Sequence, residues 1–215
     1  VIKGNTIIGG SSGIYFEGTS AANMTWDNVI DSNIVTRNFT YGIYTGFNGR
    51  IRVTKNEVTV ESPRAGNSYG IYATGCDSIF QYTGNMVDMN GNANTAYGMY
   101  FTNCDGNATQ RGIIANNKIT ALSDNQANLY GLYQTNSTFN NTVNNVISVN
   151  SEGTLVYGSY LTGTSNINFY NNTVLNNATN VATTVAAYVN GGSVGNNSVR
   201  NNIFAHLGGG RAYYV

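Results

Sequence analysis

The sequence contains little charge and no long apolar run. Only 9% of its 215 residues are charged, with ten basic and ten acidic side chains and a net charge of zero. Nucleic acids and anionic membrane surfaces are bound through clustered Lys and Arg, so this composition argues against both as partners. No apolar stretch approaches the length of a membrane span, so we expect no membrane-spanning segment. Asn, Gly, Ser, Thr and Tyr take the place of charged residues.

A tyrosine phrase repeats along the whole chain. Tyr-Gly-Ile-Tyr at 41–44 and 69–72 returns as close variants at 97–100, 130–133 and 157–160, with weaker copies at 12–15 and 185–188. The steps between copies are about 28 residues, apart from one of 33. A unit this short cannot bury its own apolar face and must stack on its neighbours, which predicts a solenoid. We expect an extra loop within the long step, at Gly106–Arg111 or Asn90–Ala96.

A second phrase, Asn-x-Val or Asn-x-Ile, recurs half a period later. Its first residues are Asn28, Asn56, Asn85, Asn117, Asn145 and Asn172, and in the last coil either Asn197 or Asn202. The third residue is β-branched in all six clear copies. Because side chains alternate across a strand, both the Asn and the β-branched residue should point inward. Stacked inward amides would bond to one another from coil to coil.

A third, weaker strand lies between these two, as at 51–53, 79–82, 113–115 and 167–170. No segment has a helical period with caps. The expected fold is therefore an all-β, right-handed parallel β-helix of about seven coils, each of about 28 residues with three short strands. We treat residues 1–215 as a single domain. The first and last residues read like the middle of a repeat without polar caps, so we expect a piece of a longer chain.

The 28-residue coils and the Asn-x-Val/Ile columns resemble the right-handed parallel β-helices of the pectate-lyase-like superfold. That resemblance covers essentially the whole chain, and it implies a fold more than a function, because the fold carries lyases, hydrolases, tailspikes and non-catalytic surface proteins. The bias toward Asn, Thr, Gly and Tyr is similar to that of large secreted or cell-surface β-helix proteins of Bacteroidota-type bacteria. By this analogy we expect a secreted or cell-surface location.

The tyrosine phrase is the main candidate site. Its third residue is apolar, so alternation predicts that the first Tyr also points inward and that Gly and the second Tyr point outward. The second tyrosines would form an aromatic strip on the surface, with Thr74, Thr102, Thr135 and Thr162 beside it. The strip could bind a polysaccharide or cell-surface glycan, or its rings could only stabilise neighbouring strands. The predicted contact residues are Tyr72, Tyr100, Tyr133 and Tyr160.

Other chemistry is sparse. Enzymes of the resembled fold place several carboxylates on adjacent coils, whereas the acids of this chain mostly occupy different columns, and its one histidine, His206, stands alone near the C-terminal end. The acidic residues are Glu17, Asp27, Asp31, Glu57, Glu61, Asp77, Asp88, Asp105, Asp124 and Glu152. A paired-carboxylate glycosidase site is therefore poorly supported.

Cys76-Asp77 and Cys104-Asp105 stand 28 residues apart and should stack directly. The cysteines could form a disulfide after a small local shift, or remain as two buried thiols. The two Asp beside Asn48 could hold Ca²⁺, or be two like charges in a solvated turn. We predict no metal and no cofactor.

Together these features favour a non-catalytic structural or adhesive segment that contacts glycans along the tyrosine strip, with further repeats of the same polypeptide as its neighbours. The alternative is the scaffold part of a polysaccharide lyase or glycoside hydrolase whose catalytic coils lie elsewhere.

Overall fold

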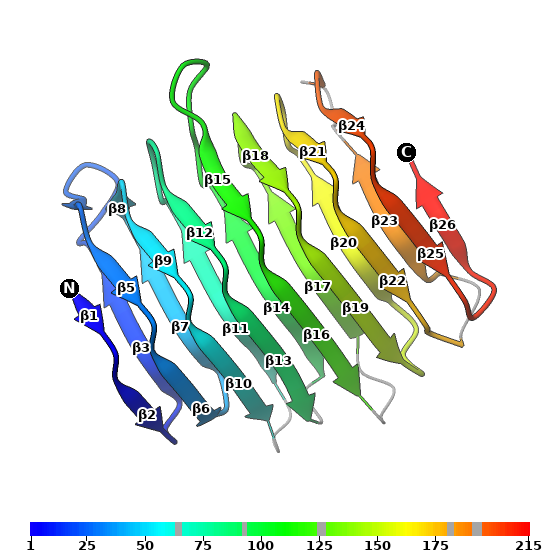
Figure 1. Cartoon of the computed structure of the whole chain (residues 1–215), viewed down its shortest axis with the longest axis horizontal. Coiled ribbons are helices and arrows are strands. Elements are labelled where there is room, and N and C mark those ends of the chain that lie inside the picture. The colour runs from blue at the N-terminus through cyan, green and yellow to red at the C-terminus, as the bar shows by residue number, and fades with distance from the viewer. Residues whose placement is uncertain (63–65, 92–93, 124–127, 180–182, 191–194) are drawn as a thin grey trace.

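The computed structural model describes residues 1–62, 66–91, 94–123, 128–179, 183–190 and 195–215. They form a parallel β-solenoid of about seven turns with three parallel sheets, and none of the described residues is helical. Strands of the same sheet lie side by side along the long axis of the molecule (Figure 1). The predicted all-β solenoid of about 28 residues per coil is confirmed.

Within the described residues each sheet contains eight strands, which follow one another in chain order along the stack. Sheet A comprises β1 (Ile2–Lys3), β5 (Val29–Asp31), β9 (Arg52–Thr54), β12 (Gln81–Thr83), β15 (Gly112–Ala115), β18 (Asn140–Val143), β21 (Asn168–Tyr170) and β24 (Ser198–Arg200). Sheet B comprises β2 (Thr6–Ile8), β6 (Ile34–Asn38), β10 (Glu57–Ser62), β13 (Met86–Gly91), β16 (Lys118–Ser123), β19 (Val146–Ser151), β22 (Thr173–Asn176) and β25 (Ile203–His206).

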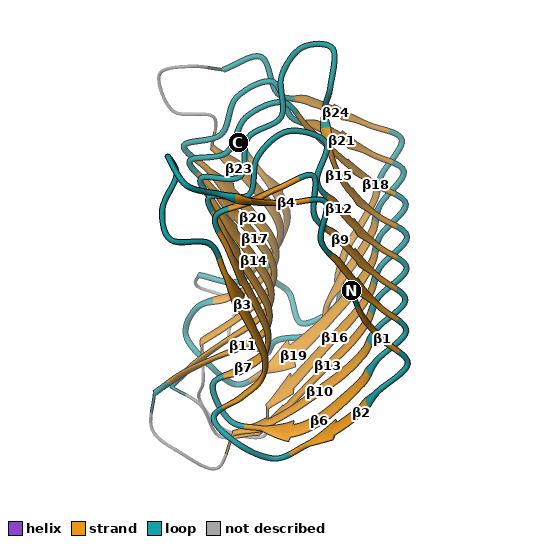
Figure 2. Ribbon diagram, turned by 90° about the vertical axis from the view of Figure 1, so that its left-hand side faces the viewer, coloured by secondary structure: helices purple, strands orange, loops and turns teal. Residues whose placement is uncertain are grey.

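Sheet C comprises β3 (Ser12–Glu17), β7 (Tyr41–Gly46), β11 (Asn67–Thr74), β14 (Thr95–Thr102), β17 (Asn128–Thr135), β20 (Val156–Thr162), β23 (Val185–Asn190) and β26 (Arg211–Tyr214). A short pair, β4 (Thr25–Trp26) and β8 (Asn48–Gly49), lies outside these sheets. Viewed along the stack, the three sheets enclose one continuous interior (Figure 2). The tyrosine phrase lies on sheet C and the Asn-x-Val phrase leads into sheet B.

The interior is filled by apolar columns from all three sheets. Sheet B contributes Val58, Val87, Ile119, Ile147 and Val174, each no more than 1% exposed. Sheet C contributes Ile71, Met99 and Leu132, and the large rings of Phe80, Tyr82 and Phe169 fill the space beside sheet A. Because every coil repeats the same inward positions, this core runs the length of the stack rather than gathering at one centre.

An asparagine ladder occupies the corner between sheets A and B. Each side-chain amide donates to the Oδ1 of the next coil's asparagine at 2.9–3.1 Å. The members are Asn5, Asn33, Asn56, Asn85, Asn117, Asn145, Asn172 and Asn202. The predicted ladder is thus correct from Asn56 to Asn172, and Asn202 rather than Asn197 continues it.

The prediction for Asn28 is wrong, because Asn33 holds the ladder position in that coil. Asn28 lies one corner earlier, at the start of sheet A, where its amide donates to Asn48 Oδ1 at 3.2 Å. The connection before it, residues 18–28, has 11 residues, whereas the matching connection 47–51 has 5. Because of this long connection, the ladder residue Asn33 comes later in the sequence than the repeat spacing predicts. Asn28 instead occupies the sequence position at which the next coils have their ladder residue.

Left-handed residues turn the chain at this corner. The residue before each ladder asparagine has a positive φ, for example 53° at Lys55, 56° at Asn116 and 55° at Asn171. Asn accepts this conformation more readily than other residues with a Cβ atom, and Gly84 adopts it without a steric cost. A single left-handed residue therefore redirects the chain from sheet A to sheet B within one or two residues.

The 33-residue step is accommodated as a loop. Residues 103–111 connect β14 to β15, and the loop extends beyond the end of sheet A, above β15 in Figure 1. This agrees with the predicted Gly106–Arg111 position. In the other predicted position, Asn90–Ala96, β13 runs to Gly91 and β14 starts at Thr95, and residues 92–93 lie outside the described part of the chain.

The facing of the tyrosine phrase differs from the prediction. Within Tyr69-Gly70-Ile71-Tyr72, Gly70 and Ile71 are both buried and both tyrosines are half-exposed. The first Tyr therefore points outward rather than inward, and the Gly faces inward rather than outward. A Cβ atom at Gly70 would lie 2.3 Å from Val87 Cγ1 and 2.5 Å from the carbonyl oxygen of Gly98. The glycine backbone therefore packs directly on sheet B, and this inward step breaks the alternation between the two tyrosines.

Candidate functional site: the tyrosine face of sheet C

The second tyrosines of the phrase form one stack along the outer face of sheet C. Their ring centroids lie 4.2–5.2 Å apart and neighbouring planes differ by 3–15°. The stack consists of Tyr15, Tyr44, Tyr72, Tyr100, Tyr133, Tyr160, Tyr188 and Tyr214. We call it the outer stack. The four predicted contact residues, Tyr72, Tyr100, Tyr133 and Tyr160, are consecutive members of it.

The first tyrosines form a parallel stack that the sequence did not place on this face. Tyr41, Tyr69, Tyr97, Tyr130 and Tyr157 follow one another at 4.9–5.3 Å. We call this row the companion stack. Within one coil its ring meets the outer ring edge to face, as in Tyr97 and Tyr100 at 5.0 Å and 87°. Sheet C therefore presents two interlocked rows of rings in the geometry that aromatic pairs favour.

Stacking decides which parts of these rings a ligand can reach. The faces of an interior ring such as Tyr100 are covered by Tyr72 and Tyr133, at 5.0 and 4.8 Å. Half-exposed edges and hydroxyl groups remain. The hydroxyls of Tyr100 and Tyr133 form no hydrogen bond with the part of the chain that the structure describes. The surface offers rows of hydroxyls at coil spacing, rather than open ring faces.

Burial changes the acidity of these phenols. It raises the pKa of Tyr72, Tyr100 and Tyr160 to about 12, with a smaller contribution from neighbouring tyrosines. The pKa of Tyr133 is raised for the same two reasons. The hydroxyls therefore stay protonated at neutral pH and can donate as well as accept hydrogen bonds. Thr74, Thr102, Thr135 and Thr162 lie half-exposed beside the outer stack, as the alternation predicted.

A carboxylate lies at one end of this face. Glu17, in β3, accepts hydrogen bonds from the hydroxyls of Tyr15 at 3.0 Å and Tyr44 at 2.9 Å. Burial and the carboxylate raise the pKa of both phenols. Glu17 takes the place that threonine holds in later coils, so the N-terminal end of the strip is acidic and its central part is neutral.

Among the remaining acids, Asp77 and Asp105 lie in neighbouring coils, as their spacing predicted. Asp27 pairs with Arg50, Asp31 lies 3.0 Å from Lys3 Nζ, and Asp105 accepts hydrogen bonds from Thr138. Asp124 lies outside the described residues. His206 lies in β25, where it contacts Thr184 Oγ1 at 2.8 Å, and burial lowers its pKa. Within the described ranges, no three His, Cys, Asp or Glu side chains are grouped so as to hold a metal ion.

The two cysteines are buried free thiols in neighbouring coils, which corresponds to the second of the two alternatives for this pair. Cys76 Sγ lies 3.5 Å from the hydroxyl of Tyr82, which in turn contacts Thr45 Oγ1 at 2.6 Å. Burial and the neighbouring Cys76 raise the pKa of Cys104. Burial and Asp105 likewise raise the pKa of Asp77.

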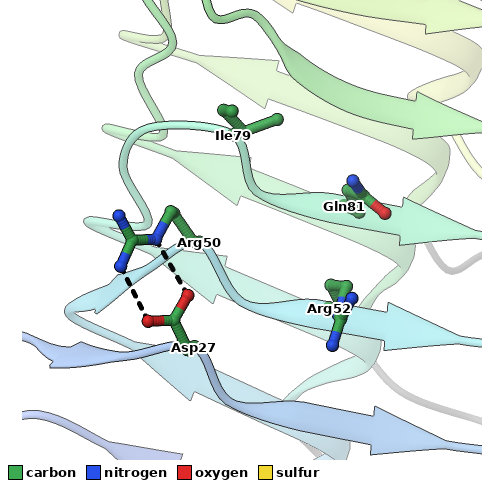
Figure 3. Close-up of a pocket in the computed structure, with 5 residues that line it drawn as sticks. All are labelled: Asp27, Arg50, Arg52, Ile79 and Gln81. Carbon is green, nitrogen blue, oxygen red and sulfur yellow. Dashed lines mark hydrogen bonds and ion pairs between the residues drawn. The ribbon is translucent and has the colours of Figure 1, made fainter.

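Sequence reasoning missed one pocket. A hollow of about 220 Å³ on the outer side of sheet A is lined by Asp27, Arg50, Arg52, Ile79 and Gln81 (Figure 3). Arg52 and Gln81 occupy paired positions of adjacent strands, one repeat apart, whereas Asp27 comes from the long connection 18–28. The available signal was the local pattern Arg50-Ile51-Arg52, two of the few cations in a charge-poor chain.

Comparisons of this chain with protein-family models, with curated proteins and with solved structures gave no match. The family remains unassigned. The chain is a parallel β-solenoid by its own geometry. No helix long and apolar enough to cross a membrane occurs in the described ranges.

Proposed function

We propose that this solenoid is a non-catalytic structural or adhesive segment of a secreted or cell-surface bacterial protein, and that it contacts glycans along the outer stack. The proposal includes the finer fold assignment, a right-handed β-helix resembling the pectate-lyase-like superfold. The observation that carries it is the row of outward phenol groups at Tyr72, Tyr100, Tyr133 and Tyr160. The hydroxyls of Tyr100 and Tyr133 have no hydrogen-bond partner among the residues that the structure describes.

The geometry suits a polymer better than a single small molecule. Neighbouring rings repeat at 4.8–5.0 Å, close to the length of one pyranose unit, so consecutive coils could meet consecutive sugars of an extended chain. Hydroxyls would exchange hydrogen bonds with sugar hydroxyls, and ring edges would supply apolar contact. Each coil contributes little, and useful affinity would come from many coils acting together. Neutral polysaccharides fit the uncharged centre of the strip.

The test compares retention on insoluble polysaccharides. Tyr100→Phe/Tyr133→Phe keeps both rings and their stacking but removes two hydroxyls, and it should lower retention several-fold. The matched control, Lys118→Ala/Val146→Ala, removes two exposed side chains from the outer face of sheet B and should bind like the unaltered chain. Circular dichroism would verify the fold. Unchanged retention of the double Phe variant on every polysaccharide that the parent binds would contradict the proposal.

The second candidate is a scaffold for a polysaccharide lyase or glycoside hydrolase whose catalytic coils lie elsewhere. Its support is Glu17, a carboxylate on the tyrosine face that contacts two phenols. Hydrolysis by paired carboxylates needs a second acid about 5–10 Å from the first. The complete gene discriminates: a sorting domain with many further repeats favours the shaft, and a short capped chain with acids near this face favours the enzyme.

A further inference from the structure

The companion stack is interrupted near the C-terminal end of sheet C, where β20, β23 and β26 lie side by side (Figure 1). The register of the sheet pairs Tyr157 of β20 with Val185 of β23, and Val185 with Arg211 of β26. The column that holds tyrosine from Tyr41 to Tyr157 thus continues with a valine and then an arginine. The ring of Tyr157 is stacked on Tyr130 at 5.3 Å, and no described ring is stacked on its other side.

A second hollow lies where the next companion ring would be. It has a volume of about 190 Å³ and is lined by three tyrosines, Tyr157, Tyr188 and Tyr214, together with Thr184, Val185 and Arg211. Because neighbouring strands are about 4.8 Å apart, one ring fits midway between the Tyr157 and Arg211 positions, which are two coils apart. A cavity of about 150 Å³ is large enough to bind benzene. The hollow therefore accommodates one aromatic ring with a small substituent.

The three tyrosines that line the hollow are those that would surround a companion ring. Each central companion ring meets two outer rings edge to face, one in its own coil and one in the next. Tyr97, for example, meets Tyr100 at 5.0 Å and Tyr133 at 5.5 Å. In the coil of the hollow the corresponding outer rings are Tyr188 and Tyr214, which are stacked at 5.1 Å. A planar ring bound there would repeat the stacked and edge-to-face contacts that aromatic pairs favour.

Arg211 gives the hollow a positive charge. Its guanidinium lies over the ring of Tyr214, 4.9 Å from the centroid. Burial and Tyr188 raise the pKa of Tyr157, and the charge of Arg211 opposes that rise. The guanidinium forms no hydrogen bond or ion pair with the described residues, and no described carboxylate lines the hollow. Its donors are therefore free to bind an anionic group beside the ring position.

We propose that this hollow binds a small aromatic acid, a phenyl or phenol ring that carries a carboxylate. The ring would take the missing place in the companion stack, against Tyr157, and the guanidinium of Arg211 would hold the carboxylate. None of the four predicted glycan contacts lines the hollow. This inference therefore holds whether or not the outer stack binds glycans.

A ligand-observed NMR titration of the folded chain with 4-hydroxyphenylacetate tests the site, at low ionic strength, where charge pairs are least screened. We expect saturable binding with a Kd of about a millimolar, as one stacked ring and one ion pair would give. Cyclohexylacetate has the same charge without an aromatic ring, and 4-methylphenol has the ring without the charge. Both should bind about threefold more weakly or worse.

Two variants locate the site. Val185→Tyr should fill the hollow with the chain's own ring and abolish binding while the fold, followed by circular dichroism, stays intact. Its matched control is Val146→Tyr, which adds a tyrosine on the outer face of sheet B, where Val146 is 50% exposed. Arg211→Gln should weaken binding about tenfold. Its control is Arg200→Gln, because Arg200 is likewise exposed and placed over a tyrosine ring, and this variant should bind like the parent.

The other outcomes each overturn part of the proposal. Equal binding by the parent and a folded Val185→Tyr variant would place the ligand elsewhere, and equal binding by Arg211→Gln would remove the role of the guanidinium. An equal response to cyclohexylacetate or to galacturonate would overturn the aromatic assignment, and an equal response to acetate would leave a general anion site. Equal binding of a blocked peptide with an internal tyrosine would favour a protein side chain over a small acid. No saturable response to 4-hydroxyphenylacetate would overturn the whole inference.

Discussion

The asparagine ladder lies inside the solenoid, at the corner between sheets A and B, whereas the two tyrosine stacks lie on the outer face of sheet C. Both place one identical side chain per coil at nearly the coil spacing. The asparagines from Asn33 to Asn172 are 1% exposed, and Asn117 donates to Asn145 Oδ1 and to the carbonyl of Tyr82, both at 2.9 Å. Tyr100 is half-exposed, and its hydroxyl has no partner in the described structure.

Repetition alone therefore does not separate a structural column from a contact surface. The difference lies in whether the protein itself satisfies the polar atoms. From Asn33 to Asn172 each side-chain amide makes two donations, and each Oδ1 accepts from the backbone and side chain of the preceding ladder residue. A substitution there should therefore act on stability. On the tyrosine face the rings are used for packing, and the hydroxyls of Tyr100 and Tyr133 have no partner among the described residues. Removing those hydroxyls should therefore act on binding, while removing the rings should act on both binding and stability.

The largest effect is expected from Asn117→Leu. Asn117 Oδ1 accepts from the backbone N–H and the side-chain amide of Asn85, both at 3.0 Å. Leucine would leave both donors buried without an acceptor, at about 1–3 kcal/mol each, so we expect about 3–5 kcal/mol less stability in urea unfolding. Asn28→Leu is the control, because Asn28 lies outside the ladder and should cost less than about 1.5 kcal/mol. Equal costs for the two variants would contradict the ladder.

A smaller effect is expected from Gly98→Ala, which tests how the two tyrosine rows come to share one face. The new Cβ atom would lie 2.4 Å from Ile119 Cγ2 and 2.5 Å from the Gly131 carbonyl. Overpacking of this kind costs about 1–3 kcal/mol, and displacement of β14 should also weaken the near-UV dichroism of the stacked rings. The control is Ala186→Gly, the reverse change in the same column. A Gly98→Ala variant as stable as the parent would show that the inward glycine is not required.

The smallest effect concerns pH. Tyr72 and Tyr100 have a pKa of about 12 in the folded chain, against about 10 in the unfolded chain. A raised folded pKa contributes stability below pH 10 that is lost as the pH rises from about 10 to about 12, because only the unfolded state readily releases the proton. We expect denaturant midpoints to fall across this interval, and phenolate absorbance to keep rising above pH 11. A titration complete by pH 11 would show that these phenols are solvated.

Much of the fold could be predicted because the coils are mutual templates. An inward position has the same kind of neighbours in every coil, so β-branched residues such as Val58, Val87 and Ile119 recur there at the repeat spacing. The loop at Gly106–Arg111 was predictable for the same reason, since a five-residue excess in one step must leave the wall at a turn. The candidate tyrosines were found by the same periodicity, although their role in binding is a proposal that the fold does not decide.

The wrong predictions for Asn28 and for the first tyrosines show what the spacing of a repeat cannot determine. Asn28 matched the spacing of the later ladder residues only because the connection 18–28 is long, and sequence distance cannot tell a longer turn from a shifted strand. The first tyrosines were expected inside because strict alternation was assumed. Gly70 and its equivalents have no side chain, so the strand can step inward there and present both tyrosines outward.

The sequence by itself determined the period, the parallel stacking of three strands per coil and most of the inward columns, because each follows from repeated local chemistry. Only the tertiary structure decided which asparagine completes the ladder, on which face the first tyrosines lie, and that Arg50 and Arg52 meet Asp27 and Gln81 in one pocket. These depend on turn lengths and on close contacts between coils. Such contacts join residues that are distant in the sequence.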